Sequence, residues 1–298
     1  MALAEELHFG RAARRCNISQ PPFSVSIQRL ESELGFPLVE RSSHGVRLTA
    51  AGAAFYEEAG KVLSQVRQAF DVASRVNVNV NGGLQGVVKI GFFASMLYRG
   101  LDRAIACFEA AFPGVAVELA ELNTAEQILA LQRCQIQYGF LHSESLPAEL
   151  ASRELLREPF MLCLPAAQAS SDRQTLSLAD VRDEPFIVFA RASSPAFYDQ
   201  VVSLCVAAGF HPNIRYEARN WLTVISCVSK GMGITLVPRS LARAGLPGLR
   251  FADIGTGPIM SVVRGAWLQS DGDDAILRNW RNVAEREVSV LLARTEAD

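Results

Sequence analysis

Hydrophobic positions near the start of the chain predict two short helices joined by a turn. Small residues gather on one side of residues 9–16, and an Asn-Ile pair then interrupts the pattern. Ser19 follows as a candidate N-cap before two prolines, which the first helical turn tolerates, and Gly35 ends the second segment. Apolar residues recur along that segment at helical steps, at Ile27, Leu30 and Leu34. The spacing therefore predicts a helix-turn-helix within residues 8–34.

Two short extended segments follow the second helix. They cover residues 36–41 and 46–49, and the turn Ser-Ser-His-Gly at residues 42–45 separates them. Short strands around a Ser/Gly turn predict a hairpin, which is typical of the wing in a winged helix domain.

One long helix is predicted from Thr49, a candidate N-cap, to about Val76. Its apolar residues fall at steps of three and four and form a single stripe, at Phe55, Ala59, Val62, Leu63, Val66, Phe70 and Ala73. A helix with one apolar stripe over many turns needs a partner. We therefore expect this helix to make the chain a homo-oligomer.

The pattern changes at residues 77–83, where asparagines alternate with valines and two glycines follow. Such a segment favours turns over helix, so we expect a hinge over residues 77–85. Beyond the hinge, strand-like and helical runs alternate. The predicted strands are residues 87–93, 115–119, 136–141, 160–164, 186–189, 214–217, 234–237 and 259–267. The predicted helices are residues 97–112, 125–134, 195–208, 221–230 and 271–292.

Regular alternation of this kind indicates α/β packing with largely parallel sheets. The number of units is sufficient for two subdomains. We expect the first subdomain to comprise residues 86–159 and 268–298, and the second to comprise residues 160–267.

Composition agrees with a multidomain globular protein. The chain has 298 residues, more than one compact core usually holds, with 49% hydrophobic and 20% charged residues. Its formal net charge of -2 excludes a protein that is basic throughout, although a small DNA-binding module can lie within a neutral average.

Neither metal chemistry nor a thiol nucleophile is indicated. The six cysteines and four histidines are dispersed, without C-x-x-C pairs or metal-ligand spacing. We expect the cysteines to be reduced and mostly buried, and we expect no metal and no cofactor.

The amino terminus carries Glu5 and Glu6 and does not have the basic and apolar regions of a secretory signal. No apolar run reaches the roughly 18 residues that a membrane span needs. We expect a cytoplasmic protein without a membrane partner.

Two dense motifs resemble the recognition helix and wing of LysR-type transcriptional regulators. They are S-Q-P-P-F-S-V-S-I-Q-R-L-E-S-E-L-G-F-P-L-V-E-R at residues 19–41 and G-V-R-L-T-A-A-G at residues 45–52. The resemblance implies a winged helix-turn-helix over residues 1–48 and a dimerising linker helix over residues 49–76. It also implies a two-subdomain effector domain over residues 86–298, with the type II periplasmic-binding-protein-like fold.

The effector half is most similar to the branch that responds to benzoate, muconate and related products of aromatic breakdown. The motifs that carry this similarity are I-G-F-F-A-S-M-L-Y at residues 90–98 and N-T-A-E-Q at residues 123–127. Two features depart from the family. Met1 falls inside the first helix, so either the start codon is misassigned or the first helix is truncated. Val25 and Ser26 stand where a basic residue and Gln are common.

A recognition helix enters the major groove of DNA by its N-terminal residues. Gln20 can pair with adenine, Ser24 can reach a base edge or phosphate, and Pro22 or Phe23 can pack on thymine methyl groups. The arginines are better explained as phosphate contacts. The expected DNA-contacting residues are Gln20, Pro21, Pro22, Phe23, Ser24, Arg29, Arg41 and Arg47. The alternative is structural: Phe23 packs inside, the arginines are solvated, and Ser19, for which this alternative is preferred, only caps its helix.

The second half of the chain predicts an anion site. Several helices directly follow strands and begin near capping residues: Ser95, Thr124 with Gln127 at capping-box spacing, Ser194 and Asn220. Helix starts gather at the carboxyl ends of parallel strands, where free N–H groups and the helix dipole attract a carboxylate. The alternative for each position is capping alone.

The family resemblance implies an effector-binding role for five residues. Members of the aromatic-acid branch hold the effector with a hydroxyl at the positions that Ser95 and Thr124 match, and line the pocket with apolar groups where Pro195 and Phe197 stand. His142 stands where some members carry Arg, and it would bind an anion only when protonated. The alternative for His142 is a partly buried side chain with one hydrogen bond.

The preferred function is an effector-gated regulator and not an enzyme. Its expected partners are a double-stranded DNA operator, a small carboxylate effector and further copies of itself, as a dimer or as a tetramer, with RNA polymerase as a further candidate. Its expected role is control of an operon of aromatic catabolism, as an activator or as a repressor. The alternatives are a solute-binding protein and an enzyme on the same two-lobed fold with Ser95 or Cys163 as nucleophile. No G-x-S-x-G, Walker or dinucleotide motif supports the enzyme.

Overall fold

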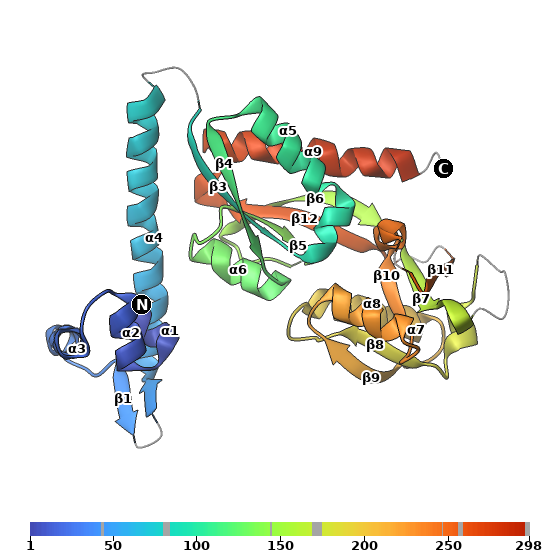
Figure 1. Ribbon diagram of the computed structural model, residues 1–298, viewed down its shortest axis with the longest axis horizontal. Coiled ribbons are helices and arrows are strands. Elements are labelled where there is room, and N and C mark those ends of the chain that lie inside the picture. Colours follow the sequence, from blue (N-terminus) through green and yellow to red (C-terminus); the bar gives the residue numbers. More distant parts are fainter. Residues whose placement is uncertain are drawn as a thin grey trace. The chain divides into compact units, whose positions relative to one another are not determined.

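The computed structural model describes residues 1–42, 45–79, 84–143, 145–168, 175–245, 247–255 and 259–295. The chain divides into two compact units, Met1–Ser74 and Arg75–Asp298 (Figure 1). No helix in the described ranges is both long enough and apolar enough to cross a bilayer.

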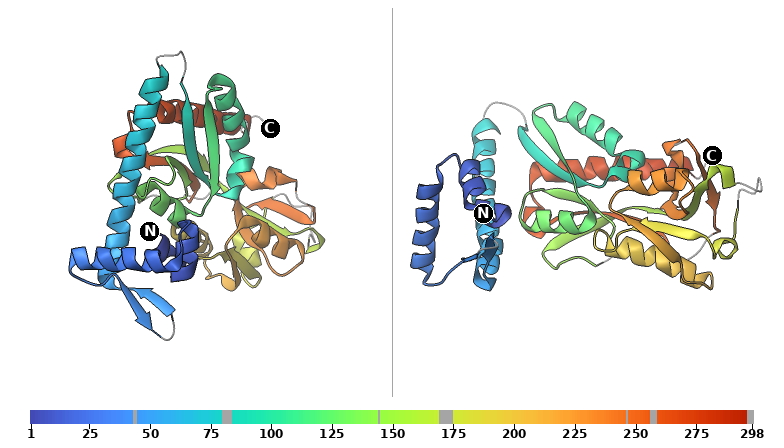
Figure 2. Two further views of the ribbon diagram at one scale, coloured as in Figure 1. Left: turned by 60° about the vertical axis from the view of Figure 1, so that its left-hand side comes forward. Right: turned by 60° about the horizontal axis from the view of Figure 1, so that its bottom comes forward.

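The first unit is a helix-turn-helix followed by a hairpin and a long helix. Its elements are α1 (Ala2–Glu6), α2 (Phe9–Arg15), α3 (Gln20–Leu34), β1 (Val39–Ser42), β2 (Gly45–Leu48) and α4 (Ala50–Asn79), whose last residues enter the second unit. β1 and β2 pair antiparallel, and this hairpin projects beyond the helices (Figure 2). The helix-turn-helix, the hairpin and the long helix predicted from the sequence are confirmed.

Local side-chain contacts explain where these helices begin. His8 caps α2, because its Nδ1 accepts the backbone N–H groups of Gly10 and Arg11 at 3.1 and 3.2 Å. Thr49 caps α4, because its Oγ1 accepts the N–H of Gly52 at 2.8 Å, as the sequence predicted. A small apolar core holds the unit together, formed by Leu3, Phe9, Ala12, Ala13 and Phe23.

The predicted hinge begins too early. α4 continues through Asn79, so the first three residues of the expected hinge are helical. Residues 80–83 lie outside the described residues. A helix that already exists adds each further residue without the cost of a new nucleus, so α4 runs on into this segment.

The second unit has two lobes, and a mixed five-stranded sheet forms the first. The strand order is β4-β3-β5-β12-β6, with β3 parallel to β4 and β5, and β12 antiparallel to β5 and β6. The strands are β3 (Gly86–Phe92), β4 (Val115–Glu121), β5 (Tyr138–Leu141), β6 (Leu150–Glu158) and β12 (Ser261–Leu268). The helical elements are η1 (Ala94–Arg99), α5 (Leu101–Ala111), α6 (Thr124–Gln132), η5 (Gln269–Asp271) and α9 (Ala275–Thr295).

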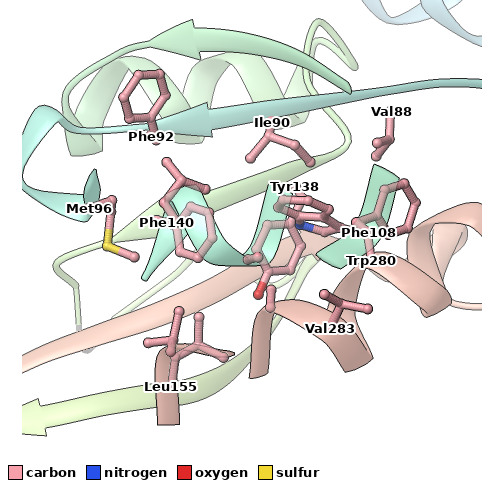
Figure 3. Close-up of a cluster of buried hydrophobic side chains, with 14 of the residues drawn as sticks. Val88, Ile90, Phe92, Met96, Phe108, Tyr138, Phe140, Leu155, Trp280 and Val283 are labelled. Atoms are coloured by element: carbon pink, nitrogen blue, oxygen red, sulfur yellow. The ribbon is translucent and has the colours of Figure 1, made fainter. Parts of the chain in front are cut away.

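Helices cover both faces of this sheet. α5 and α9 lie on one face, where Trp280 packs edge-on against Phe108 and Tyr138 with ring centroids 5.3 and 6.3 Å apart (Figure 3). α6 lies on the other face, over Ile136 and Leu141 (Figure 1). The first lobe therefore has a rigid core from which the loops at the strand ends project.

The second lobe holds two smaller sheets. β7 (Phe160–Pro165) pairs antiparallel with β10 (Thr235–Pro238) and β11 (Leu249–Asp253), and β8 (Pro185–Phe189) pairs parallel with β9 (Asn213–Ala218). Its helices are α7 (Pro195–Ala207) and α8 (Trp221–Ser229), with the short elements η2 (Ala166–Gln168), η3 (Leu178–Val181) and η4 (Arg239–Ala244). A separate apolar core fills this lobe.

Three expectations about these lobes are wrong, and two strands were missed. The five-stranded sheet is mixed and the three-stranded sheet is antiparallel, so the sheets are not largely parallel. The strands β6 and β11 were not predicted, because neither shows a regular alternation of buried and exposed residues. The helix predicted over 97–112 is two elements, because Gly100 adopts a left-handed φ of 90° between η1 and α5. Finally, β12 pairs with β5 and β6, so residues 261–267 belong to the first lobe.

Candidate functional site

A cavity of about 200 Å³ lies between the two lobes of the second unit. From the first lobe it is lined by Phe93, Ala94, Glu121, Leu122, Asn123, Thr124, Glu126 and His142. From the second lobe it is lined by Phe189, Ser193, Ser194, Phe197, Arg219, Asn220 and Trp221. The starts of α6, α7 and α8 thus meet at one cavity, as the sequence analysis expected of helices that follow strands.

The start of α6 differs by one residue from the prediction. Asn123 and Glu126 form the capping box: Asn123 Oδ1 accepts the N–H of Glu126 at 3.0 Å, and Glu126 Oε2 accepts the N–H of Asn123 at 2.9 Å. Thr124 is the first helical residue, and its Oγ1 accepts the backbone N–H of His142 at 3.3 Å. The predicted capping box of Thr124 and Gln127 is therefore wrong, and the Thr124 side chain is free of that capping role.

The residues that precede α7 and α8 differ: one caps its helix and the other does not. Asn220 caps α8, accepting the N–H of Thr223 at 2.9 Å, as predicted. Ser194 precedes α7 but makes no capping hydrogen bond with its side chain. It is only 7% exposed, and its Oγ has no hydrogen-bond partner among the described residues. A buried hydroxyl without a partner is costly, so Ser194 is suited to bind a ligand in the cavity.

Ser95 lies behind the cavity wall and does not begin a helix. Phe93 is the N-cap of η1, so the prediction that Ser95 caps a helix is wrong. Ser95 is buried, and its Oγ accepts a hydrogen bond from Arg99 Nη1 at 3.2 Å. The neighbouring Ala94 lines the cavity.

Arg99 is a functional candidate that the sequence analysis missed. Its side chain is fully buried and pairs with Glu158, with Nε 2.9 Å from Oε1. Burial lowers the pKa of Arg99, against the opposing effect of the Glu158 carboxylate. Two of its partners, Glu158 and Ser240, lie 59 and 141 residues away in the chain, so no local sequence pattern could have indicated those contacts.

His142 lines the cavity as a neutral ring. Its Nδ1 lies 3.0 Å from the carbonyl oxygen of Val262, and its Nε2 lies 3.2 Å from Arg99 Nη1. Because Arg99 can only donate, Nε2 accepts and Nδ1 carries the proton. Burial, and then the Arg99 charge, hold the pKa of His142 well below its ordinary value. His142 is therefore not in the protonated form that the sequence analysis required for anion binding by this residue.

Aromatic rings form the apolar part of the cavity. Phe197 is buried and packs against Trp221 at 5.4 Å, and Trp221 packs against Phe189 at 4.4 Å. Phe93 stacks on His142 at 4.5 Å. Phe197 was predicted to line the site, whereas Phe93, Phe189 and Trp221 were not. The only signal for Trp221 was its place directly after a helix-capping asparagine.

A second hollow adjoins the first and has a volume of about 650 Å³. It shares Thr124 and His142 with the first cavity, and Pro195 lines it together with Ile259 and Met260. The five predicted effector residues thus lie around one region between the lobes, with Ser95 behind its wall.

The first unit presents an exposed polar helix start. Gln20, Pro21 and Pro22 are exposed in the first turn of α3, and Ser24 is partly exposed. Phe23 is buried at 7% exposure and packs edge-on against Phe9 at 6.2 Å. The expectation that Phe23 contacts thymine is therefore wrong, because its ring belongs to the core.

Ser19 occupies the N-cap position of α3 but makes no capping hydrogen bond. A capping side chain accepts the N–H of the second or third helical residue, and both are prolines here, Pro21 and Pro22. The preferred explanation of Ser19 as a cap is thus wrong, and its hydroxyl is exposed.

The predicted phosphate contacts lie on α3 and the hairpin. Arg29 is exposed and pairs with Glu33 one turn later at 3.0 Å. Arg47 is exposed on β2. Arg41 lies on β1 opposite Val46, and its side chain is outside the described part of the structure. Arg11 and Arg15 of α2 do not add free cations to this surface, because Arg11 pairs with Glu6 and Arg15 pairs with Glu5.

The apolar stripe of α4 is exposed where the structure describes it. Val62, Leu63 and Val66 are 57%, 50% and 46% exposed. The side chains of Phe70 and Ala73 lie outside the described residues. A row of large exposed apolar residues on one helix indicates an interaction surface.

Metal and thiol chemistry find no support in the described ranges. No three His, Cys, Asp or Glu side chains there gather as a metal site would require. Burial raises the pKa of Cys163 to about 12, so the reactive thiolate would be scarce.

Comparison with protein families matches both units. Residues 1–53 match the bacterial regulatory helix-turn-helix protein model of the lysR family, and residues 81–289 match the LysR substrate binding domain. The chain is 38% identical over 240 residues to the transcriptional regulator AlsR of Bacillus subtilis, covering 80% of this chain and 78% of that protein. It is 37% identical over 262 residues to IlvR of Caulobacter vibrioides, covering 87% and 86%.

Solved structures share the whole fold. The LysR family transcriptional regulator CbnR aligns with a TM-score of 0.74 at 26% identity, covering 96% of both chains. Full-length CbnR complexed with its target DNA aligns with a TM-score of 0.73 at 27% identity and the same coverage. Full-length BenM aligns with a TM-score of 0.60 at 28% identity, covering 96% of this chain and 93% of that chain.

Proposed function

The chain belongs to the LysR family of DNA-binding transcriptional regulators, and from this premise we propose that a small carboxylate bound between its two lobes controls its action on an operator. The single observation that carries the proposal is the buried, unpartnered hydroxyl of Ser194 at a cavity where three helices begin. Helix starts present free N–H groups and a positive dipole end, which favour an anion.

The remaining lining indicates the body of the effector. Phe93, Phe189, Phe197 and Trp221 offer apolar and aromatic surface beside the polar helix starts. A volume of about 200 Å³ corresponds to roughly seven water molecules. A compact aromatic or unsaturated carboxylate, such as benzoate or muconate, has the required combination of one charged end and an apolar body.

Fixed charges restrict where the carboxylate binds. Glu121 and Glu126 line the cavity from the first lobe, and Arg219 lines it from the second. Glu126 is held in the capping box by the N–H of Asn123. We place the effector carboxylate toward the hydroxyls of Ser194 and Thr124, with Arg219 as the cation of the cavity lining, and its body against the rings.

The first unit is proposed to bind the operator through the start of α3. Gln20, Pro21, Pro22 and Ser24 are the residues that would face the bases, and Arg29, Arg41 and Arg47 would contact phosphates. The exposed stripe of α4 would pair two copies, so that two recognition helices meet two half-sites. CbnR, whose fold this chain shares, has been solved with its target DNA, which supports the same mode of binding here.

Calorimetric titration of the wild type with benzoate, muconate and salicylate tests the proposal. Ser194→Ala and Thr124→Val should each weaken binding by about tenfold to a hundredfold, the effect of losing a charge-assisted hydrogen bond of roughly 1.5–3 kcal/mol. Ser177→Ala is the matched control, because Ser177 caps η3 of the second lobe away from the cavity. The control should lower stability by about 1 kcal/mol and leave affinity unchanged. Wild-type affinity in both cavity variants would refute the assignment.

A further inference from the structure

The buried guanidinium of Arg99 lies between the cavity wall and the junction of the lobes. On one side its Nε lies 2.9 Å from Glu158 Oε1 and 2.9 Å from Ser240 Oγ. On the other side its Nη1 lies 3.2 Å from Ser95 Oγ and 3.2 Å from His142 Nε2. Nη2 has no partner among the described residues. Burying a charged guanidinium costs free energy, so packing alone does not explain an arginine at this position.

The cavity side of Arg99 fixes the orientation of a lining residue. His142 donates from Nδ1 to Val262 and accepts at Nε2 from Arg99, so both ring nitrogens are occupied. Phe93, which also lines the cavity, stacks on the His142 ring and lies 5.6 Å from the Arg99 guanidinium carbon. Arg99 thus contacts two of the groups that a ligand in the cavity would touch.

The opposite side of Arg99 reaches the point where the chain changes lobes. Glu158 ends β6 in the first lobe, and β7 of the second lobe begins two residues later. The same carboxylate accepts the backbone N–H of Ser240 at 2.6 Å and its hydroxyl at 3.0 Å. Ser240 belongs to η4 of the second lobe. Glu158 therefore ties Arg99 of one lobe to Ser240 of the other.

We propose that Arg99 is a positioning residue of the ligand cavity: it keeps His142 neutral and oriented in the wall, and it joins that wall to the lobe junction through Glu158 and Ser240. The proposal rests on the proposed function, in which a ligand occupies this cavity. A ligand that shifts the Phe93–His142 wall would then shift the contacts that hold the lobes together. Binding would also not require a histidine to gain a proton.

The groups around His142 support this assignment. Arg99 of η1 is the charged side chain in contact with its ring, and Glu158 acts on the ring only through Arg99. Thr124 of α6, Phe197 of α7 and Val262 of β12, which also contact His142, carry no titrating group. Glu121, Glu126 and Arg219 line the same cavity. The neighbouring charge that opposes protonation is therefore that of Arg99.

Histidine nuclear magnetic resonance of the full-length protein tests the proposal without a ligand. With ¹⁵N-labelled imidazole rings, the wild-type His142 signal should keep the position of a neutral ring protonated at Nδ1 as the pH is lowered. In Arg99→Met the same ring should titrate at a higher pH than in the wild type, because the adjacent cation is gone. Arg99→Lys keeps the charge and should keep the ring neutral. The matched control is Arg153→Met, which removes an exposed arginine paired with Glu285 and should change nothing.

One result would overturn the proposal, and a second variant keeps it testable if the first does not fold. An unchanged His142 titration in Arg99→Met would overturn it, since a merely structural role predicts that result. If Arg99→Met does not fold, Arg99→Met combined with Glu158→Met removes both charges of the pair and leaves no unpaired carboxylate. The double variant should show the same upward shift of the His142 titration.

Calorimetry with benzoate, muconate and salicylate tests the link to the lobe junction. Ser240→Ala alters no residue of the cavity lining. It should weaken, by several-fold, the binding of any probe that binds the wild type, whereas Ser177→Ala should not. Equal affinity in Ser240→Ala would overturn the link. If no probe binds the wild type, the carboxylate assignment fails, while the histidine spectra still decide the role of Arg99.

Discussion

The carboxylate of Glu31 on α3 accepts the backbone N–H of Leu38 at 2.7 Å. The same oxygen accepts the N–H of Val39 at 3.1 Å. One side chain thus ties the candidate recognition helix to the first strand of the hairpin, which fixes the angle between the two elements proposed to contact DNA.

Removal of this contact should loosen the first unit. Glu31→Ala leaves two partly buried N–H groups without their acceptor, so the free energy of unfolding should fall by about 1–3 kcal/mol. Chemical denaturation measures the loss. Glu33→Ala is the control, because Glu33 lies on the same helix and forms only an exposed pair with Arg29, worth about 0–1 kcal/mol. Equal effects of the two substitutions would contradict the structural role of Glu31.

Two glycines of α4 should respond to alanine in opposite directions. A Cβ at Gly52 would overlap the backbone carbonyl of Leu38, which cannot move aside as a side chain could. Gly52→Ala should therefore destabilise the unit by about 1–3 kcal/mol. A Cβ at Gly60 meets only Met1 Cε at 3.5 Å, so Gly60→Ala should stabilise by roughly 0.5–1 kcal/mol. Thermal melts of the two variants check the contrast, and a shared sign would contradict it.

A charge on the exposed stripe of α4 should dissociate the oligomer. Val66→Glu would bury a carboxylate between two copies, which is costly without a partner. Sedimentation should show smaller species, and operator binding should be lost with them. Ala54→Glu adds the same charge to an exposed position earlier in the helix and should leave the oligomer intact. Wild type that sediments as a monomer at micromolar concentration would refute self-association through this stripe.

Two DNA-binding variants should differ in kind. Arg47→Ala should weaken binding to all sequences about equally. The loss of one phosphate contact should also make the slope of log K against log salt concentration less steep by about 0.9. Gln20→Ala should instead remove about 1–3 kcal/mol of discrimination between operator and random DNA. Gel-shift titrations at several salt concentrations, with a genomic fragment selected by the wild type, measure both. An unchanged salt slope would remove Arg47 from the interface.

His142 should make the folded state less stable as the pH falls. Its pKa is lowered in the fold by burial and by Arg99, so below its ordinary value near 6.5 the unfolded chain binds a proton that the folded chain does not. Stability should then decrease with falling pH by up to about 1.4 kcal/mol per unit, until the folded ring also titrates. Unfolding of His142→Gln should lack this contribution to the slope, whereas that of His211→Gln, at an exposed position, should retain it.

Local patterns in the sequence were sufficient for most elements and for part of the sites. The capping of α8 by Asn220 and the apolar stripe of α4 depend only on neighbouring residues. Phe23 could have been assigned to the core, because it precedes Ile27 by one helical turn. The sequence could also have shown that the Ser19 hydroxyl does not cap α3. The two prolines favour the start of a helix, but they lack the N–H groups that a capping side chain accepts.

Contacts across long stretches of chain could not be predicted in this way. Arg99 gains its role from Glu158 and Ser240, which the fold brings to it from other elements. β12 joins the first lobe because it pairs with β5 and β6, and these strands lie more than a hundred residues earlier in the chain. Neither hydrophobic period nor capping signals carry information about such pairings.

The position of β12 in the sheet order β4-β3-β5-β12-β6 also determines when the first lobe can be completed during synthesis. β6 pairs with β12, and β12 reaches the ribosome exit only after every strand of the second lobe. During translation, β6 therefore lacks its partner strand β12 at a stage when the second lobe already has all its strands and can fold. An arrest of translation before Ser261 would leave a finished second lobe attached to an incomplete sheet. The emergence of residues 261–268 and then of α9 would close that sheet last.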